Sequence, residues 1–219
     1  MHMLGVIGAM GEEVQPLLNQ MTDVRTSVHA EISVTKGSYK IALAQSGIGR
    51  VNATICTQML IDLYQPAKLV FNGVAGGLLL NMRAGDIIVA SYVVQYDMDL
   101  TAFGWRRGEA PGRDRLIECH PDLVGKATAA FDAAFDDFED APNLMLGTIA
   151  SGDKFVQGKA MQRWLQREFA ALSDSSGETA SDDFEENLQV ACRNSFQLMD
   201  RMIPIAMRER EHNDRRRSD

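Results

Sequence analysis

The sequence predicts an α/β fold in three layers, α-β-α, around a mixed, mostly parallel central sheet. Short apolar runs bounded by small residues, such as Leu4–Ala9 and Lys68–Asn72, have the composition of buried strands. Between such runs lie segments with apolar residues at helical spacing, for example Glu12–Met21. Strands that alternate with helices form a mostly parallel sheet with helices on both faces.

The other elements follow the same two patterns. Further strands are predicted at Ile32–Val34, Tyr39–Ala44, Asp86–Val94 and Leu144–Ala150. Further helices are predicted at Val51–Tyr64, Pro121–Phe135, Lys159–Ala171 and Asp182–Met207, the last with Asp182 and Glu185 as a capping box. A long polar loop is expected from Tyr96 to about Arg115.

The length and composition fit one domain. The 219 residues are 45% hydrophobic, and no repeat or low-complexity linker divides them, so we expect a single domain over residues 1–207. Residues 208–219 are rich in charge and nearly without apolar side chains, which predicts a frayed or disordered tail.

The charge balance argues against nucleic acid and membrane surfaces as partners. The formal net charge is -8, and an acidic surface repels phosphate backbones and anionic lipid. The N-terminus has no basic and apolar leader, and no run has the length of a membrane span. Cys56, Cys119 and Cys192 are far apart and are expected to be buried free thiols, which suits the cytoplasm.

Candidate chemistry lies where strands end, since ligands of such sheets bind at the carboxyl ends of the strands. After the first strand, Glu12 and Glu13 fall in the first turn of a helix, whose dipole keeps a carboxylate ionised as a base for water. Ordinary helix N-terminal charge is the alternative. In Asn72–Gly77, glycines permit a ligand to approach the backbone, with Val74, Ala75 and Gly76 as candidate contacts. An ordinary tight turn is the alternative.

Two later segments add an aromatic ring and an acid. In Ser151–Val156, Phe155 is either a stacking surface for a flat base or a core residue. Ser173–Glu178 is predicted as a polar loop between two helices, in which Asp174 is either a general acid or a turn former. The four histidines are scattered, and neither metal nor organic cofactor is expected.

These motifs, in this order, resemble the nucleoside phosphorylase/nucleosidase superfamily, and most closely the bacterial 5'-methylthioadenosine/S-adenosylhomocysteine nucleosidases. The similar segments are Gly5–Glu13, Ser46–Gly49, Gly73–Gly77, Asp97–Gly104, Ser151–Phe155 and Ser173–Asp174, and the resemblance extends to about residue 207. It implies hydrolysis of the N-glycosidic bond of these purine nucleosides, with release of adenine and without a cofactor.

The resemblance also implies a role for each matching residue. Glu13 is similar to the carboxylate that activates water, and Asp174, beside Ser173, to the acid at purine N7. The other matches are Phe155 stacked on adenine, the Val156 backbone at the base edge, Met10 near the ribose, and Ile48, Phe103 and Pro111 reaching into a neighbouring subunit's site. The implied assembly is a homodimer.

The sequence departs from the family after Phe169. There the family has a strand with a Val-Glu-Met-Glu motif that holds the ribose hydroxyls, followed by a helix and a strand ending in Arg, before Ser-Asp. Here Ala171-Leu172 runs straight into Ser173-Asp174, so roughly 25–30 residues, about one strand-helix unit, are missing. We expect unpaired neighbouring strands and weakened activity.

Two other functions therefore stay open: a related purine nucleoside phosphorylase or nucleosidase, and a catalytically impaired nucleoside-binding homologue. The acidic pair Glu12-Glu13 favours hydrolysis over phosphorolysis, because two carboxylates oppose a phosphate anion at the same place.

Overall fold

The computed structural model describes residues 3–24, 39–79, 81–154, 156, 158–174 and 184–208. The chain divides into two compact units. Unit 1 comprises Met1–Gly73, Ala129–Asp136 and Ser195–Asp219, and unit 2 comprises Val74–Thr128 and Asp137–Asn194. Each unit is assembled from segments far apart in the sequence, so the units are not consecutive domains; the single domain over residues 1–207 stays a prediction.

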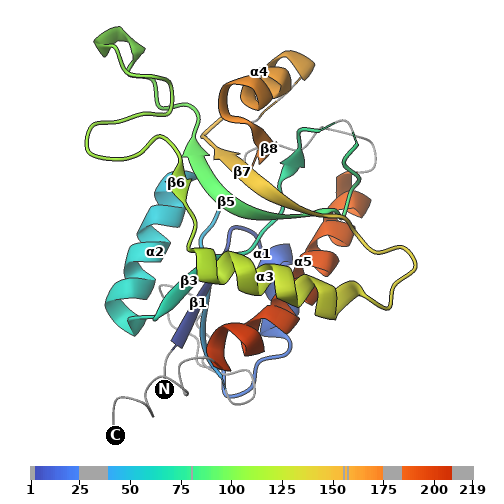
Figure 1. Ribbon diagram of the computed structural model, residues 1–219. Helices are drawn as coiled ribbons and strands as arrows, with labels where there is room; N and C mark the ends of the chain where they lie inside the picture. The colour runs from blue at the N-terminus through green and yellow to red at the C-terminus, as the bar shows by residue number, and fades with distance from the viewer. Residues whose placement is uncertain are drawn as a thin grey trace, which may run out of the picture. The chain divides into compact units, whose positions relative to one another are not determined.

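Unit 1 is built on a three-stranded parallel sheet. Strand β1 (Met3–Gly8) lies between β2 (Lys40–Gln45) and β3 (Lys68–Phe71), with α1 (Gly11–Leu18) and α2 (Arg50–Tyr64) against β1 and β2 (Figure 1). The five residues of β1 after Met3 are all buried. Because successive side chains point to opposite faces, both faces of this strand are covered, as the three-layer prediction requires.

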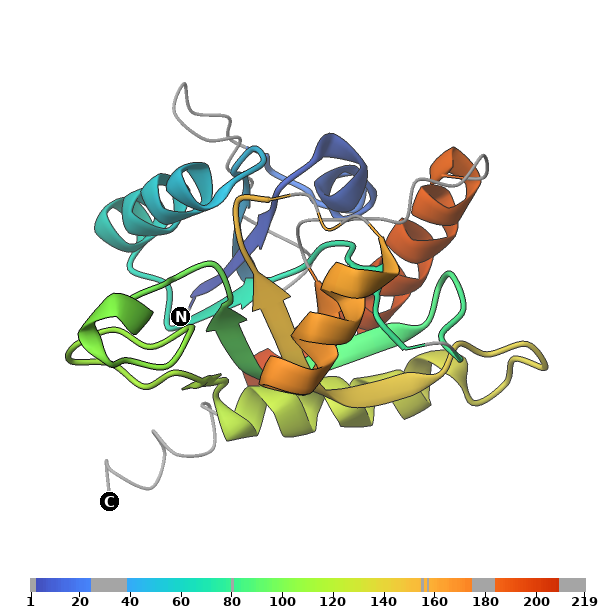
Figure 2. The same ribbon diagram turned by 90° about the horizontal axis from the view of Figure 1, so that it is seen from above.

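Unit 2 contains a five-stranded mixed sheet in the order β4-β8-β7-β5-β6. Its strands are β4 (Gly76–Gly77), β5 (Ile87–Gln95), β6 (Ile117–Glu118), β7 (Leu144–Ser151) and β8 (Ala171–Asp174). The three central strands β8, β7 and β5 are parallel, and the two short edge strands are antiparallel. Helix α4 (Lys159–Phe169) packs over β7 and β8 (Figure 2).

The remaining helices complete the fold. The short 3-10 helix η1 (Thr101–Phe103) lies within the loop after β5, while α3 (Pro121–Phe135) and α5 (Phe184–Arg208) contribute residues to both units. None of the helices in the described parts of the chain combines the length and apolar character needed to cross a membrane.

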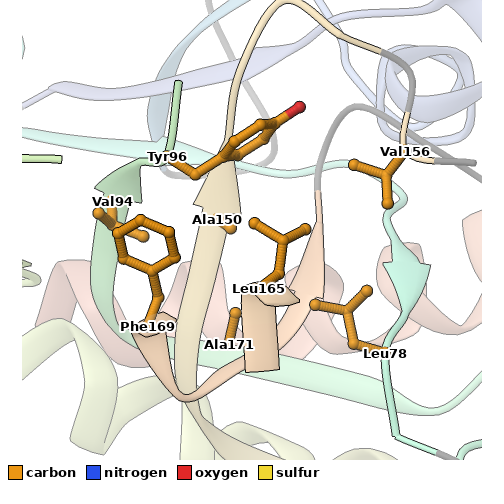
Figure 3. Close-up of a cluster of buried hydrophobic side chains, with 8 residues drawn as sticks. All are labelled: Leu78, Val94, Tyr96, Ala150, Val156, Leu165, Phe169 and Ala171. Atoms are coloured by element: carbon orange, nitrogen blue, oxygen red, sulfur yellow. The ribbon is translucent and has the colours of Figure 1, made fainter. Parts of the chain in front are cut away.

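The core of unit 2 lies between α4 and its sheet. The cluster consists of Leu78, Val94, Tyr96, Ala150, Val156, Leu165, Phe169 and Ala171 (Figure 3). Leu165 is fully buried at its centre, and Trp164 meets the Tyr96 and Phe169 rings edge-on, at 6.3 and 5.5 Å between centroids. The apolar side of α4 therefore fixes the segments that follow β5 and β7.

The α/β class and most of the predicted elements are confirmed, with boundaries shifted by one to three residues. Instead of one central sheet, the described residues form two. The predicted strand Ile32–Val34, the cap at Asp182 and the charged tail from residue 209 onward lie outside the described residues.

The polar loop predicted from Ser173 was wrong at its start. Helix α4 ends where Ala170 adopts a left-handed conformation (φ 50°), and the chain then enters strand β8. Asp174 pairs with Ala150 of β7 on one side and with Gly76 of β4 on the other. Backbone pairing along both edges makes this segment a strand despite its polar residues, and β7 is not left unpaired on this side.

Truncating Leu165 tests this core. We expect Leu165→Ala to lower the free energy of unfolding by about 2–5 kcal/mol, because it leaves a cavity in a fully buried cluster. Leu146, which is 51% exposed, is the matched control, and Leu146→Ala should cost clearly less. Urea unfolding followed by circular dichroism compares the two, and equal losses would contradict this account of the core.

Candidate active site

The carboxylate of Glu13 is held by the backbone at the start of α1. Its Oε2 accepts hydrogen bonds from the amides of Ala9 (2.6 Å) and Met10 (2.9 Å). Glu13 is the third residue of the helix and is 6% exposed, whereas Glu12 points into solvent. A buried carboxylate needs hydrogen-bond donors in place of water, and the free amides at the start of the helix supply them.

The ends of all three strands of unit 1 meet beside this carboxylate. The Ser46 amide donates to the Gly8 carbonyl (2.8 Å), and the Gly47 amide to the Ala9 carbonyl (3.1 Å). From the other side, the Asn72 amide donates to the Ile7 carbonyl (2.8 Å). The turn whose Ala9 and Met10 amides bind Glu13 is thus hydrogen-bonded to the residues that follow β2. The residue that follows β3 is hydrogen-bonded to the end of β1.

In unit 2, sheet pairing brings three predicted site residues together. Gly76 of β4 pairs with Asp174 of β8, and Ser173 pairs with Gly77 on one side and Ile149 on the other. Val74 and Ala75 directly precede this strand. The glycine motif and the Ser-Asp pair, about 100 residues apart in sequence, are therefore adjacent strands of one sheet.

Tyr96 organises the segment after β7, a feature that sequence reasoning missed. Its hydroxyl donates to the Lys154 carbonyl (2.7 Å), and its ring lies where a β-carbon on Gly152 would approach Cζ to 2.5 Å. The Asp153 amide donates to Asp97 (3.0 Å). Val156 is buried in the core cluster, so its backbone position is fixed; Phe155 lies outside the described residues.

The loop after β5 carries Phe103 and Pro111 and is fastened to α4. Phe103 is 79% exposed, and Pro111 is also exposed. Arg115 donates to the Arg107 carbonyl (2.7 Å), forms an ion pair with Glu168, and stacks over Phe169 at 4.6 Å. Within the loop, hydrogen bonds from Thr101, and then the Arg107 guanidinium, hold the pKa of Asp99 below its usual value.

Two of the cysteines are poor candidates for a nucleophile. Burial raises the pKa of Cys56 and of Cys119, which disfavours the thiolate. No group of three or more histidine, cysteine or carboxylate side chains gathers as a metal site in the described part of the chain. Of the two carboxylates predicted to be catalytic, Glu13 belongs to unit 1 and Asp174 to unit 2.

Comparison with known proteins assigns the family. The model of the phosphorylase superfamily matches residues 3–174. A 5'-methylthioadenosine/S-adenosylhomocysteine nucleosidase of Colwellia psychrerythraea is 32% identical, over 91% of this chain and 94% of the relative. The chain belongs to the phosphorylase superfamily and, within it, to the 5'-methylthioadenosine/S-adenosylhomocysteine nucleosidases.

Solved structures of this superfamily share the fold. The nucleosidase of Neisseria meningitidis in complex with methylthio-immucillin-A gives a TM-score of 0.83 at 25% identity and covers 93% of this chain and 99% of that chain. A futalosine hydrolase of Helicobacter pylori gives a TM-score of 0.81 at 26% identity, with coverages of 93% and 97%. The fold is therefore that of the nucleosidases.

The alignment with the Colwellia psychrerythraea nucleosidase leaves about as many positions of this relative unmatched as the predicted missing segment contains. It runs over 229 positions but uses 91% of the 219 residues here, which is about 199, so roughly 30 positions of the Colwellia psychrerythraea nucleosidase face a gap. In this chain only Ala170 separates α4 from β8. These observations agree with the loss of one strand-helix unit.

Removing the Tyr96 hydroxyl tests how the segment after β7 is held. We expect Tyr96→Phe to cost about 1 kcal/mol of stability, because it removes a hydrogen bond in a partly buried place. Amide hydrogen exchange should accelerate in residues 152–158 more than in β5. Tyr92→Phe, at a 39% exposed ring of the same strand, is the control, and identical exchange in both variants would contradict the assignment.

Proposed function

We propose that this chain hydrolyses the N-glycosidic bond of 5'-methylthioadenosine and S-adenosylhomocysteine, releasing adenine and the thioribose product. The observation that carries the proposal is the buried Glu13 carboxylate, held by two backbone amides where three parallel strands of a nucleosidase fold end. Its relatives bear the name of this activity.

The chemistry requires a base and an acid on opposite sides of the bond. Breaking the ribose-adenine bond builds positive charge on the sugar and negative charge on the departing base. Glu13 takes a proton from the attacking water, and its fixed Oε2 leaves little rotational freedom to the carboxylate. Asp174, beside Ser173, supplies the proton or hydrogen bond at purine N7.

The residues proposed for adenine binding are those that the resemblance assigns to it. Phe155 stacks on the base, the backbone of Val156 contacts the base edge, and Val74, Ala75 and Gly76 line the substrate. Burial of the Val156 side chain supports this role, because it fixes the backbone whose polar groups would meet adenine. Met10, whose own amide holds Glu13, is proposed to pack near the ribose.

Adenine release tests the reaction. Pure protein incubated with 5'-methylthioadenosine should release adenine at the same rate with and without phosphate, because a carboxylate beside the water site opposes a phosphate nucleophile. Phosphate dependence would instead indicate a phosphorylase, and adenine binding without turnover an impaired homologue. The futalosine hydrolase likeness makes futalosine the second substrate to compare.

Two carboxylate variants test the assigned roles. Glu13→Gln and Asp174→Asn should each lower kcat by about 10²–10⁴-fold, since each removes one proton-transfer group. Glu12→Gln is the matched control, because the neighbouring carboxylate is exposed and should leave kcat within a few-fold. Full activity in both catalytic variants would show that the site is wrong.

We also propose a homodimer that completes the site around the 5'-alkylthio group. Ile48 is 75% exposed, and Val51 and Ile55 on α2 are 69% and 54% exposed, so an apolar stripe at helical spacing lines one side of this helix. An exposed apolar stripe of this kind is typical of a protein-protein contact. Ile48, Phe103 and Pro111 are the residues that we expect to reach the partner's substrate.

A charge on this stripe should separate the subunits. Val51→Asp places a carboxylate in the proposed apolar contact and should convert a dimer into monomers in sedimentation velocity. Phe138→Asp, at another exposed apolar residue, should leave the assembly unchanged. A wild-type protein that sediments as a monomer at micromolar concentration would contradict the dimer.

The cytoplasm is the proposed compartment. Cys56, Cys119 and Cys192 form no disulfide, which supports a reducing environment.

A further inference from the structure

We propose that Gly73 is a positioning residue for the proposed catalytic base: its missing side chain provides the space in which the Glu13 carboxylate is held. The proposal rests on Glu13 being the base of the proposed reaction. It concerns unit 1 alone, because both residues belong to it.

The geometry leaves no room for a β-carbon at this position. A β-carbon built on Gly73 would lie 2.8 Å from Glu13 Oε1, the shortest contact, 3.1 Å from Glu13 Cδ and 3.0 Å from Phe71 Cε1. Carbon-oxygen contacts below 3.0 Å force a shift, and the far oxygen of the same carboxylate is already held by the Ala9 and Met10 amides. A side chain here would therefore push the carboxylate away from both amides.

Space, and not backbone conformation, makes Gly73 necessary. Its φ lies outside the left-handed region that favours glycine, so alanine could adopt the same backbone. The preceding residue is also fixed, because the Ser195 hydroxyl of α5 donates to Asn72 Oδ1 (2.6 Å) and the Asn72 amide is bonded to β1. The strand end has little freedom to retreat from the carboxylate.

Gly8 leaves room for the other end of the Glu13 side chain, at its Cβ. A β-carbon on Gly8 would lie 3.3 Å from Glu13 Cβ and 2.6 Å from Val14 Cγ1. Gly8, Ala9, Met10 and Gly73 together form what we call the Glu13 cradle: two amides hold one oxygen, and two glycines leave the room for the rest. A base held in this way keeps a defined direction toward the reacting water.

A double-mutant cycle on stability tests the contact directly. Gly73→Ala should lower the urea midpoint of the full chain, and the loss should be much smaller in a Glu13→Ala background, where the carboxylate is gone. If Gly73→Ala fails to fold, recovery of folding in Gly73→Ala/Glu13→Ala supports the proposal equally. Equal losses in both backgrounds, failure to fold in both, or no loss in the wild type would overturn it.

A second glycine of unit 1 provides the matched control. A β-carbon on Gly5 would lie 2.4 Å from Leu69 Cδ2, so Gly5→Ala should also destabilise the protein. Because Glu13 is not among its nearest contacts, that loss should be the same with Glu13 and with Glu13→Ala. Coupling of Gly5 to Glu13 as strong as that of Gly73 would mean that the cycle reports general destabilisation, and would overturn the proposal.

Turnover separates positioning from mere packing. Gly73→Ala should lower kcat about 100-fold with little change in KM, since displacement of a catalytic group by about 1 Å costs this much. In a Glu13→Gln background the same substitution should cause no further loss. Unchanged kcat in Gly73→Ala overturns the proposal. If the wild type itself releases no adenine, the proposed function fails, and the stability cycle still decides the contact.

Discussion

The hydrogen bonds from the Ala9 and Met10 amides to the Glu13 carboxylate are the constraint on which the rest of unit 1 depends. At a carboxylate that is 6% exposed, backbone donors replace the hydrogen bonds that water would otherwise make. These amides are available because β1 leads directly into α1 through a short turn. That turn is hydrogen-bonded to the residues that follow β2. The hydrogen bonds at the end of the parallel sheet thus fix the orientation of the Glu13 carboxylate.

In unit 2, hydrogen bonds and strand pairing likewise fix the segments that carry the residues proposed for adenine binding and for the acid. Strand pairing places Gly76 beside Asp174, and the Tyr96 hydroxyl fixes the carbonyl of Lys154 just before the expected adenine-stacking residue. In both units backbone groups contribute to this positioning, and in unit 2 the Tyr96 hydroxyl adds a side chain. Short glycine-containing motifs, each weak alone, are informative together because each marks the end of a strand, where ligands of such sheets bind.

Local patterns predicted the parts of the fold that depend on local sequence. The spacing of apolar residues and the glycines that bound them predicted β1, α2 and α3 to within a few residues, because both signals act over short distances. Strand β8 was mistaken for a loop, since its identity depends on β4 and β7, which pair with it from distant sequence. The roles of Gly73 and Tyr96 were equally hidden, because a steric limit and a hydrogen bond to a distant residue leave no periodic signal.

The predicted loss of a strand-helix unit bears more on substrate binding than on the sheet of unit 2. Strand β8 follows α4 after a single residue and pairs on both edges, so β7 keeps a parallel neighbour and the five-stranded sheet is continuous. What such a unit would supply, by resemblance to the family, is the grip on the ribose hydroxyls. Binding energy from parts of a substrate remote from the reacting bond contributes to the transition state as well as to affinity. A chain that keeps the base and the adenine side but lacks this grip should therefore lose rate before it loses recognition of adenine.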